Sequence, residues 1–221
     1  MKSCLTFLLF GVLFNNSSLA QDPWKNVYRE SAWKERDSWQ RPDEIIKNLN
    51  LKAGSHVADI GCHEGYMTLK LSKVVMEKGK VYAVDVDQSK LDLLQENVNE
   101  QKVNNVIPVK GEYDNPKLPV NELDAVVILD TYHEMDDHAK ILQHIKLALK
   151  KKGRLVLCEP IAESRKNLSR QQQEEKHELG LNFALEDVKM AGFEIIYQKD
   201  AFADRSKVKG DMMWILVAEK K

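Results

Sequence analysis

A short glycine-containing segment has the residue types and the setting of a ligand-binding loop. It consists of Asp59-Ile60-Gly61-Cys62-His63-Glu64-Gly65 and lies between an apolar run and a helical pattern. A glycine just after a strand lets the backbone approach a ligand closely, and the start of the following helix offers free N–H donors. We therefore expect a ligand to bind in the crevice above this loop.

An acidic residue follows at the interval that nucleotide binding favours. Asp85 stands at the end of the next apolar run, about 20 residues after the loop, where a carboxylate can accept hydrogen bonds from both hydroxyls of a ribose. Together the loop and the acid predict an adenosine-containing cofactor. The spacing Gly61-x-x-x-Gly65 differs from the G-x-G-x-x-G of dinucleotide-binding loops, which disfavours a nicotinamide-dependent oxidoreductase.

Alternating apolar runs and helical patterns supply the frame for these residues, as in βαβ units. Near-continuous apolar runs such as Ala125 to Leu129 suit strands that are buried on both faces. The last two strands have no long helix between them, so we expect them to be antiparallel neighbours. The sequence predicts an α/β fold: a Rossmann-like, doubly wound, mostly parallel seven-stranded sheet with an antiparallel C-terminal strand. Strands are expected at His56 to Gly61, Lys80 to Asp87, Val106 to Gly111, Leu123 to Asp130, Arg154 to Glu159, Phe193 to Gln198 and Met213 to Ala218, and helices at Asp43 to Leu49, Tyr66 to Glu77, Ser89 to Gln101, Asp136 to Lys150 and Leu185 to Ala191.

Several motifs in order along the chain resemble the class I S-adenosylmethionine-dependent methyltransferases. Asp59, Gly61 and Gly65 match that family's D-x-G-x-G-x-G loop, with His63 in place of the middle glycine. Leu149 to Glu159 resembles its segment L-K-x-G-G-x-L-x-x-x-E, with Lys152-Gly153 in place of the two glycines. The resemblance covers residues 40 to 219 and implies that the cofactor is S-adenosylmethionine.

The resemblance also implies roles for single residues. Asp85 corresponds to the family's ribose-binding acid, and Glu112 either accepts from the adenine amino group or is a solvated loop acid. Asp59 either accepts backbone N–H bonds within the loop or lies near the methionine amino group. His63 either contacts the cofactor's carboxylate or is a tolerated replacement. The expected cofactor-binding residues are Asp59, Gly61, His63, Gly65, Asp85 and Glu112.

The stretch after the fourth expected strand, Asp130-Thr131-Tyr132-His133-Glu134, would face the reactive methyl group. Methyl transfer is an in-line displacement at a carbon on a cationic sulfur, so placement of the acceptor supplies much of the rate. His133 either takes a proton from the acceptor or only shapes the pocket. We expect catalytic roles for Asp130, Tyr132 and His133. His177 belongs to a polar helical segment, Glu163 to Leu179, that either caps the acceptor pocket or is a solvated face.

Two segments, Trp39 to Ile45 and Asp130 to Glu134, look like a bacterial group of exported class I methyltransferases whose acceptors are mostly undefined. The sequence therefore predicts methyl transfer to a small-molecule acceptor without identifying it. The alternative is a protein that holds S-adenosylmethionine or a related nucleoside without turnover. An intact Tyr132 and His133 favour the enzyme, whereas the His63 substitution favours the binding protein.

Composition and charge restrict the partners. The chain has 221 residues, of which 43% are hydrophobic, as suits one α/β domain. Its 33 Lys and Arg against 34 Asp and Glu give a formal net charge of -1, so no general attraction to nucleic acid or an anionic membrane is expected. No Cys/His set has the spacing of a metal site, so we expect no metal. No Ser/His/Asp order suggests a hydrolase. Oligomeric state is not predicted.

The first twenty residues have the pattern of a secretory signal peptide. Lys2 precedes an apolar run from Leu5 to Phe14, and Ser18-Leu19-Ala20 forms a small-x-small cleavage site before Gln21. The apolar run is too short to span a bilayer, so we expect no stable membrane anchor. The expected product is a periplasmic or secreted protein whose mature chain begins at Gln21.

The segment 21–40 is an expected N-terminal aromatic arm, ahead of a methyltransferase domain over 41–221. The arm carries Trp24, Tyr28, Trp33 and Trp39, so it is expected to pack on the domain rather than remain a disordered linker. These aromatic side chains either cover the cofactor or an acceptor site, or only dock the arm.

Cleavage would remove Cys4 and leave two cysteines, Cys62 and Cys158. An oxidising compartment favours a disulfide between them. The expected fold opposes it, because a third strand between theirs would separate their Cα atoms by roughly 9 to 10 Å, beyond the limit of about 7 Å. We expect two free thiols.

Overall fold

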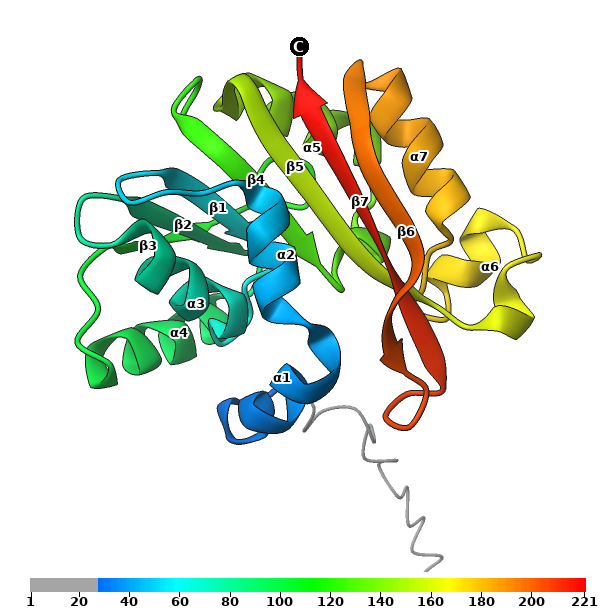
Figure 1. The fold of residues 1–221 in the computed structure, drawn as a ribbon, viewed down its shortest axis with the longest axis horizontal. Helices are drawn as coiled ribbons and strands as arrows, with labels where there is room; N and C mark the ends of the chain where they lie inside the picture. The colour runs from blue at the N-terminus through cyan, green and yellow to red at the C-terminus, as the bar shows by residue number, and fades with distance from the viewer. Residues whose placement is uncertain (1–27) are drawn as a thin grey trace, which may run out of the picture.

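The computed structural model describes residues 28–221, which form a seven-stranded sheet with helices on both faces (Figure 1). The strand order is β3-β2-β1-β4-β5-β7-β6. All neighbouring pairs are parallel except those of β7, which is antiparallel to both β5 and β6. The predicted fold class is therefore confirmed. The strands are β1 (His56–Ile60), β2 (Lys80–Asp85), β3 (Val106–Lys110), β4 (Leu123–Leu129), β5 (Leu149–Ile161), β6 (Phe193–Arg205) and β7 (Asp211–Lys220).

The helices divide between the two faces because side chains of the central strands alternate. Val57 of β1 and Val127 of β4 pack with apolar residues of the first three helices, whereas Ala58 and Ile128 pack with those of α5 and α7. Two separate buried layers result, one on each side of the sheet. The helices are α1 (Trp33–Gln40), α2 (Pro42–Leu49), α3 (Tyr66–Val75), α4 (Gln88–Glu100), α5 (His138–Ala148), α6 (Arg170–Glu174) and α7 (Leu181–Met190).

The expected bounds of the last strands are too short. β5 begins at Leu149 rather than Arg154, because Leu149 pairs with Leu123 across a register shift, and it runs on to Ile161 opposite Met212. β6 continues to Arg205, which carries the end of the β6–β7 hairpin toward the carboxyl ends of the central strands. α7 begins at Leu181 rather than Leu185.

The expected polar helix over Glu163 to Leu179 is wrong. Only a 3-10 turn, η3 (Glu163–Arg165), and α6 form there. The buried amide of Gln173 explains the break: its Nε2 donates to the carbonyls of Arg165 and Leu168, and its Oε1 accepts from Gly180 N at 2.7 Å. One side chain thus satisfies backbone groups that a continuous helix would pair, and it folds the segment into a compact loop.

Both described cysteines are free and buried, as expected. Cys158 lies on β5 and Cys62 directly follows β1, with β4 between these strands. The strand order therefore keeps the two thiols apart.

The expected signal peptide, residues 1–20, lies outside the described residues, as does Trp24. Of the other arm aromatics, Trp39 at the end of α1 is buried in the core on the α1 to α3 face, and Trp33 packs edge-on against Tyr66, with ring centroids 6.0 Å apart. Among residues 28–221, no helix has both the length and the apolar character needed to cross a bilayer.

Candidate functional site

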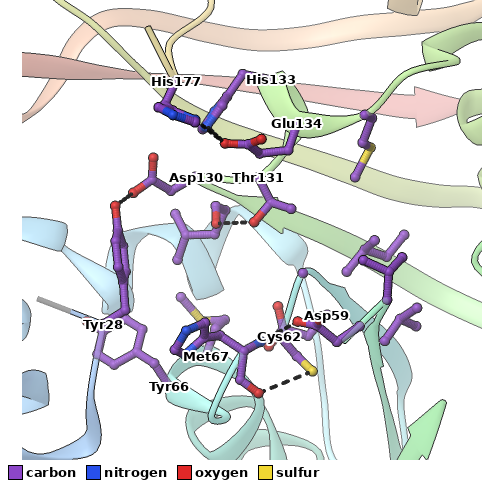
Figure 2. Close-up of a pocket in the computed structure, with 18 of the residues that line it drawn as sticks. Tyr28, Asp59, Cys62, Tyr66, Met67, Asp130, Thr131, His133, Glu134 and His177 are labelled. Carbon is purple, nitrogen blue, oxygen red and sulfur yellow. Dashed lines mark hydrogen bonds and ion pairs between the residues drawn. The ribbon is translucent and has the colours of Figure 1, made fainter. Parts of the chain in front are cut away.

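A pocket of about 600 Å³ lies at the carboxyl ends of β1, β2 and β4 (Figure 2). Its volume falls in the range of about 300 to 1,000 Å³ that small-molecule sites occupy. The lining includes the loop after β1, the start of α3, the ends of β2 and β4, residues 176–178 and the N-terminal segment at Tyr28 and Arg36. The pocket therefore stands where open α/β sheets bind their ligands.

The loop after β1 is shaped by the close approach of β4. Gly61 has a φ of +77°, and a Cβ added there would lie 2.4 Å from Thr131 Cγ2. His63 has a φ of 49°, the left-handed conformation that the family's glycine adopts freely. The imidazole of His63 lines the pocket, and burial, together with Lys90 and Arg36, lowers its pKa to about 4. Its ring is therefore neutral at pH 7.

Gly65 has a different role from Gly61. It has a φ of +99° and begins α3, but it does not line the pocket. A Cβ at this position would lie 2.5 Å from Leu94 Cδ1 of α4. Gly65 therefore permits the turn into α3 and the contact between α3 and α4.

The carboxylate of Asp85 connects the loop to β2. Its Oδ2 accepts from His63 N at 2.9 Å, and its Oδ1 accepts from Asp87 N at 2.9 Å. A carboxylate has about four acceptor positions, so these two bonds leave capacity for further donors. Because Asp85 is half-buried and lines the pocket, it can accept from ligand hydroxyls there.

Asp59 and Glu112 also line the pocket, in contrasting environments. The Asp59 carboxyl is buried and accepts from Thr68 Oγ1 at 2.6 Å, and burial raises its pKa to about 6. Glu112 is exposed and pairs with Lys117 at 2.5 Å. Five of the six expected cofactor-binding residues, all except Gly65, are thus brought to one pocket.

A buried ionic cluster forms the wall opposite the loop. Arg205 of β6 donates to Asp130 Oδ2 at 2.5 Å and forms two hydrogen bonds with Asp211. The hydroxyl of Tyr28 donates to the same Asp130 oxygen at 2.6 Å. Burial opposes ionisation of Asp130, but Arg205 outweighs it and holds the pKa of that carboxyl well below its usual range. Asp130 is therefore an anion that several donors already engage.

His133 stands between two carboxylates. Its Nδ1 lies 2.5 Å from Glu159 Oε2, and its Nε2 lies 3.1 Å from Glu134 Oε1. Burial favours the neutral ring, but Glu159 and the hydrogen bond to Glu134 raise the pKa of His133 to about 10. In this state both ring nitrogens carry protons at pH 7, which favours the pocket-shaping role over that of a proton acceptor.

Tyr132 does not reach the pocket. Its side chain is fully buried, and its hydroxyl donates to Asp187 of α7 at 3.0 Å. The catalytic role expected for Tyr132 does not fit this position. Its backbone N–H instead donates to Glu159 Oε1 at 3.0 Å, which fixes the turn that carries His133.

Arg36 is a pocket residue that the sequence analysis missed. It comes from α1, is 6% exposed, and stacks on the Tyr66 ring with its guanidinium carbon 4.1 Å from the ring centroid. Within residues 28–221 its Nε donates to Gln40 at 3.2 Å, while its other nitrogens make no hydrogen bond. A buried arginine in a pocket is suited to bind a carboxylate. Helical spacing alone did not reveal it, because Arg36 lies in a polar, charged stretch of sequence.

Comparisons with known proteins agree on one family. Residues 51–214 match the model of the methyltransferase domain family. The chain is 26% identical over 147 residues to the demethylmenaquinone methyltransferase of Staphylococcus saprophyticus, a match that covers 66% of this chain and 60% of that protein. It is 34% identical over 113 residues to the probable cobalt-precorrin-6B C(15)-methyltransferase (decarboxylating) of Sulfurisphaera tokodaii, covering 51% of this chain and 57% of that protein. The matches therefore span somewhat more than half the length of these relatives.

Solved structures share the fold. The chain matches a SAM-dependent methyltransferase from Aquifex aeolicus with a TM-score of 0.71 and 25% identity, covering 88% of this chain and 100% of that one. It also matches phosphoethanolamine N-methyltransferase 2 of Haemonchus contortus in complex with S-adenosyl-L-methionine, with a TM-score of 0.68 and 17% identity, covering 89% of this chain and 58% of that one.

Gly61→Ala should destabilise the protein more than Gly210→Ala. Both glycines have a φ of +77°, which costs an alanine about 1 to 2 kcal/mol, but a Cβ at Gly210 meets nothing within 4 Å. At Gly61 the overlap with Thr131 adds overpacking of about 1 to 3 kcal/mol. Urea unfolding of both variants measures the difference, and equal losses would contradict the close approach of Thr131.

Proposed function

The chain belongs to the methyltransferase domain family, and on that basis we propose that it transfers a methyl group from S-adenosylmethionine to a small-molecule acceptor. The proposal rests on one observation: a single pocket is lined by the glycine loop, by the acidic end of β2 and by the residues that follow β4. The loop and Asp85 suit an adenosyl group, and the space near Asp130 and His133 leaves room for an acceptor (Figure 2).

Binding of the cofactor would use residues that line this pocket. Asp85 would accept from the ribose hydroxyls, since two of its acceptor positions stay open. Glu112, which also lines the pocket, would accept from the adenine amino group. Arg36 would pair with the methionine carboxylate. The Asp59 carboxyl, once ionised, would accept a hydrogen bond from the methionine ammonium group.

The residues near Asp130 and His133 would hold the reactants in position and would not transfer protons to or from the acceptor. When bound, S-adenosylmethionine supplies a methyl group on a cationic sulfur, which a nucleophile attacks in line. Tyr28 and Tyr66 place aromatic rings in the pocket wall, and the Asp130 anion lines the same pocket. Because both His133 nitrogens already face carboxylates, an acceptor that must lose a proton needs another means of doing so.

A small acceptor suits both the pocket and the names of the relatives. The named relatives methylate demethylmenaquinone or cobalt-precorrin-6B, both small molecules. The formal net charge of -1 provides no general attraction for nucleic acid. We thus propose that the acceptor is a small molecule, without naming the compound.

A protein that binds S-adenosylmethionine without turnover is the second candidate. The engagement of both His133 nitrogens favours it, because that imidazole offers no free nitrogen to an acceptor. An assay with a panel of thiols, phenols, quinols and amines distinguishes the methyltransferase from the binding protein. Only the methyltransferase would form S-adenosylhomocysteine with one of these acceptors. Tight cofactor binding with no product from any of them would favour the binding protein.

Asp85→Asn should weaken S-adenosylmethionine binding roughly 10- to 100-fold, since hydrogen bonds to a charged group contribute about 1.5 to 3 kcal/mol. Isothermal titration calorimetry of S-adenosylmethionine and S-adenosylhomocysteine measures this loss. Asp92→Asn is the matched control, because Asp92 is exposed on α4 and outside the pocket. Wild-type protein that binds neither ligand would exclude the proposed function.

Arg36→Gln should weaken binding of S-adenosylmethionine and S-adenosylhomocysteine by a similar factor, through loss of a charge-assisted bond to their carboxylate. It should leave the affinity for 5'-methylthioadenosine unchanged, because that nucleoside has no carboxylate. Calorimetry with the three ligands makes the comparison, and Arg29→Gln, at an exposed residue of the same segment, is the control. Equal weakening for all three ligands would mean that Arg36 only supports the fold.

We also propose that the protein is exported and cleaved before Gln21, on the strength of the pattern in residues 1–20. Expression in a bacterial host should place the protein in the periplasmic fraction with Gln21 as its first residue. N-terminal sequencing of the fractionated protein tests this. Recovery of uncleaved chain in the cytoplasm would refute the proposal.

A further inference from the structure

Three side chains with metal-ligating atoms meet at the acceptor end of the pocket. One ligand atom each from His133, Glu134 and His177 lies within 4.8 Å of the others. All three residues line the pocket, and Figure 2 shows their side chains turned toward one another above Asp130. We propose that they bind a divalent transition-metal ion such as Zn²⁺.

The donor set fits such an ion. Two imidazole nitrogens and one carboxylate oxygen are ligands that Zn²⁺ and related ions accept, and three protein ligands leave coordination positions open. His133 is 4% exposed at its side chain, whereas Glu134 and His177 are 51% and 70% exposed. The cluster therefore has one fixed ligand in the interior and two that an entering ion can reach from solvent.

Glu159 provides the outer support that metal-binding histidines usually have. Its carboxylate is fully buried and lies 2.5 Å from His133 Nδ1. It also accepts from the backbone N–H of Thr131 at 2.7 Å, so its own position is fixed. A carboxylate on one ring nitrogen orients the ring and directs the other nitrogen, here Nε2, toward the metal.

The charges around His133 call for a cation at this point. Glu134 and Glu159 approach its two nitrogens, and the buried carboxylate of Asp130 lies nearby. A divalent ion held by His133 Nε2, Glu134 Oε1 and His177 Nδ1 would place positive charge among these carboxylates.

The metal would also define the class of acceptor, an inference that rests on the proposed function. Open coordination positions facing the pocket suit an acceptor with a hydroxyl or thiol group. Coordination lowers the pKa of such a group, so its proton leaves to solvent without a protein base. The acceptor oxygen or sulfur then forms a bond to the methyl carbon as the bond from that carbon to the sulfonium sulfur breaks, leaving a methylated acceptor and S-adenosylhomocysteine.

The expectation that the sequence holds no metal site came from spacing along the chain. Glu134 and His177 are 43 residues apart, and no local motif joins them. The loop folded around Gln173 brings His177 to the pocket, and that loop is where the sequence predicted a continuous helix instead.

Calorimetry of the full chain, freed of metal with a chelator and titrated with ZnCl₂ in the absence of S-adenosylmethionine, tests the proposal. One Zn²⁺ should bind per chain with a dissociation constant in the micromolar range or below. His177→Ala should weaken zinc binding at least tenfold, and because His177 is exposed this variant should fold. His144→Ala, at a histidine of α5 outside the pocket, should bind zinc as the wild type does.

Zinc binding that is absent from the wild type, or equal in His177→Ala, would overturn the proposal. S-adenosylhomocysteine binding is measured in the same metal-free samples. This measurement distinguishes a failure of the metal-site proposal from a failure of the proposed function. Cofactor binding without zinc binding would refute the metal site and leave the proposed function standing. Zinc binding without cofactor binding would support the metal site and refute the proposed function.

Discussion

The buried ion pair between Arg205 and Asp130 is the interaction on which the pocket depends. Arg205 is fully buried at the end of β6, and Asp130 follows β4, so the pair joins segments that are 75 residues apart. Asp211 pairs with Arg205, and Tyr28 donates to Asp130. A buried charge that loses its partner is strongly destabilising, which makes the four groups interdependent. They fix the N-terminal segment and the β6–β7 hairpin against the central strands.

A second buried carboxylate orders the neighbouring strand end. Glu159 of β5 accepts three backbone N–H groups from residues 131–133 as well as the His133 ring. The turn after β4 therefore has little freedom, and the imidazole has a defined direction. Two adjacent parallel strands thus contribute an anion each, and both anions are satisfied by groups from elsewhere in the chain.

The two ends of the pocket differ in how they are built. The proposed cofactor end includes short-range features: Gly61 and His63 follow β1, Asp85 ends β2, and the backbone of the loop donates directly to Asp85. The acceptor end depends on contacts between distant segments, with Tyr28, Asp130 and Arg205 as one group and His133 with His177 as another.

The sequence by itself determined the mostly parallel seven-stranded sheet, the antiparallel last strand, the glycine loop and most of the predicted cofactor-binding residues that line the pocket. These follow from hydrophobic periodicity and from motifs that lie within a few residues of a strand end, so local pattern is enough. Only the tertiary structure showed that Tyr132 faces Asp187, that Arg36 enters the pocket, and that both nitrogens of His133 face carboxylates. Side-chain direction and pKa depend on burial and on charges from remote segments, and no spacing along the chain encodes those distances.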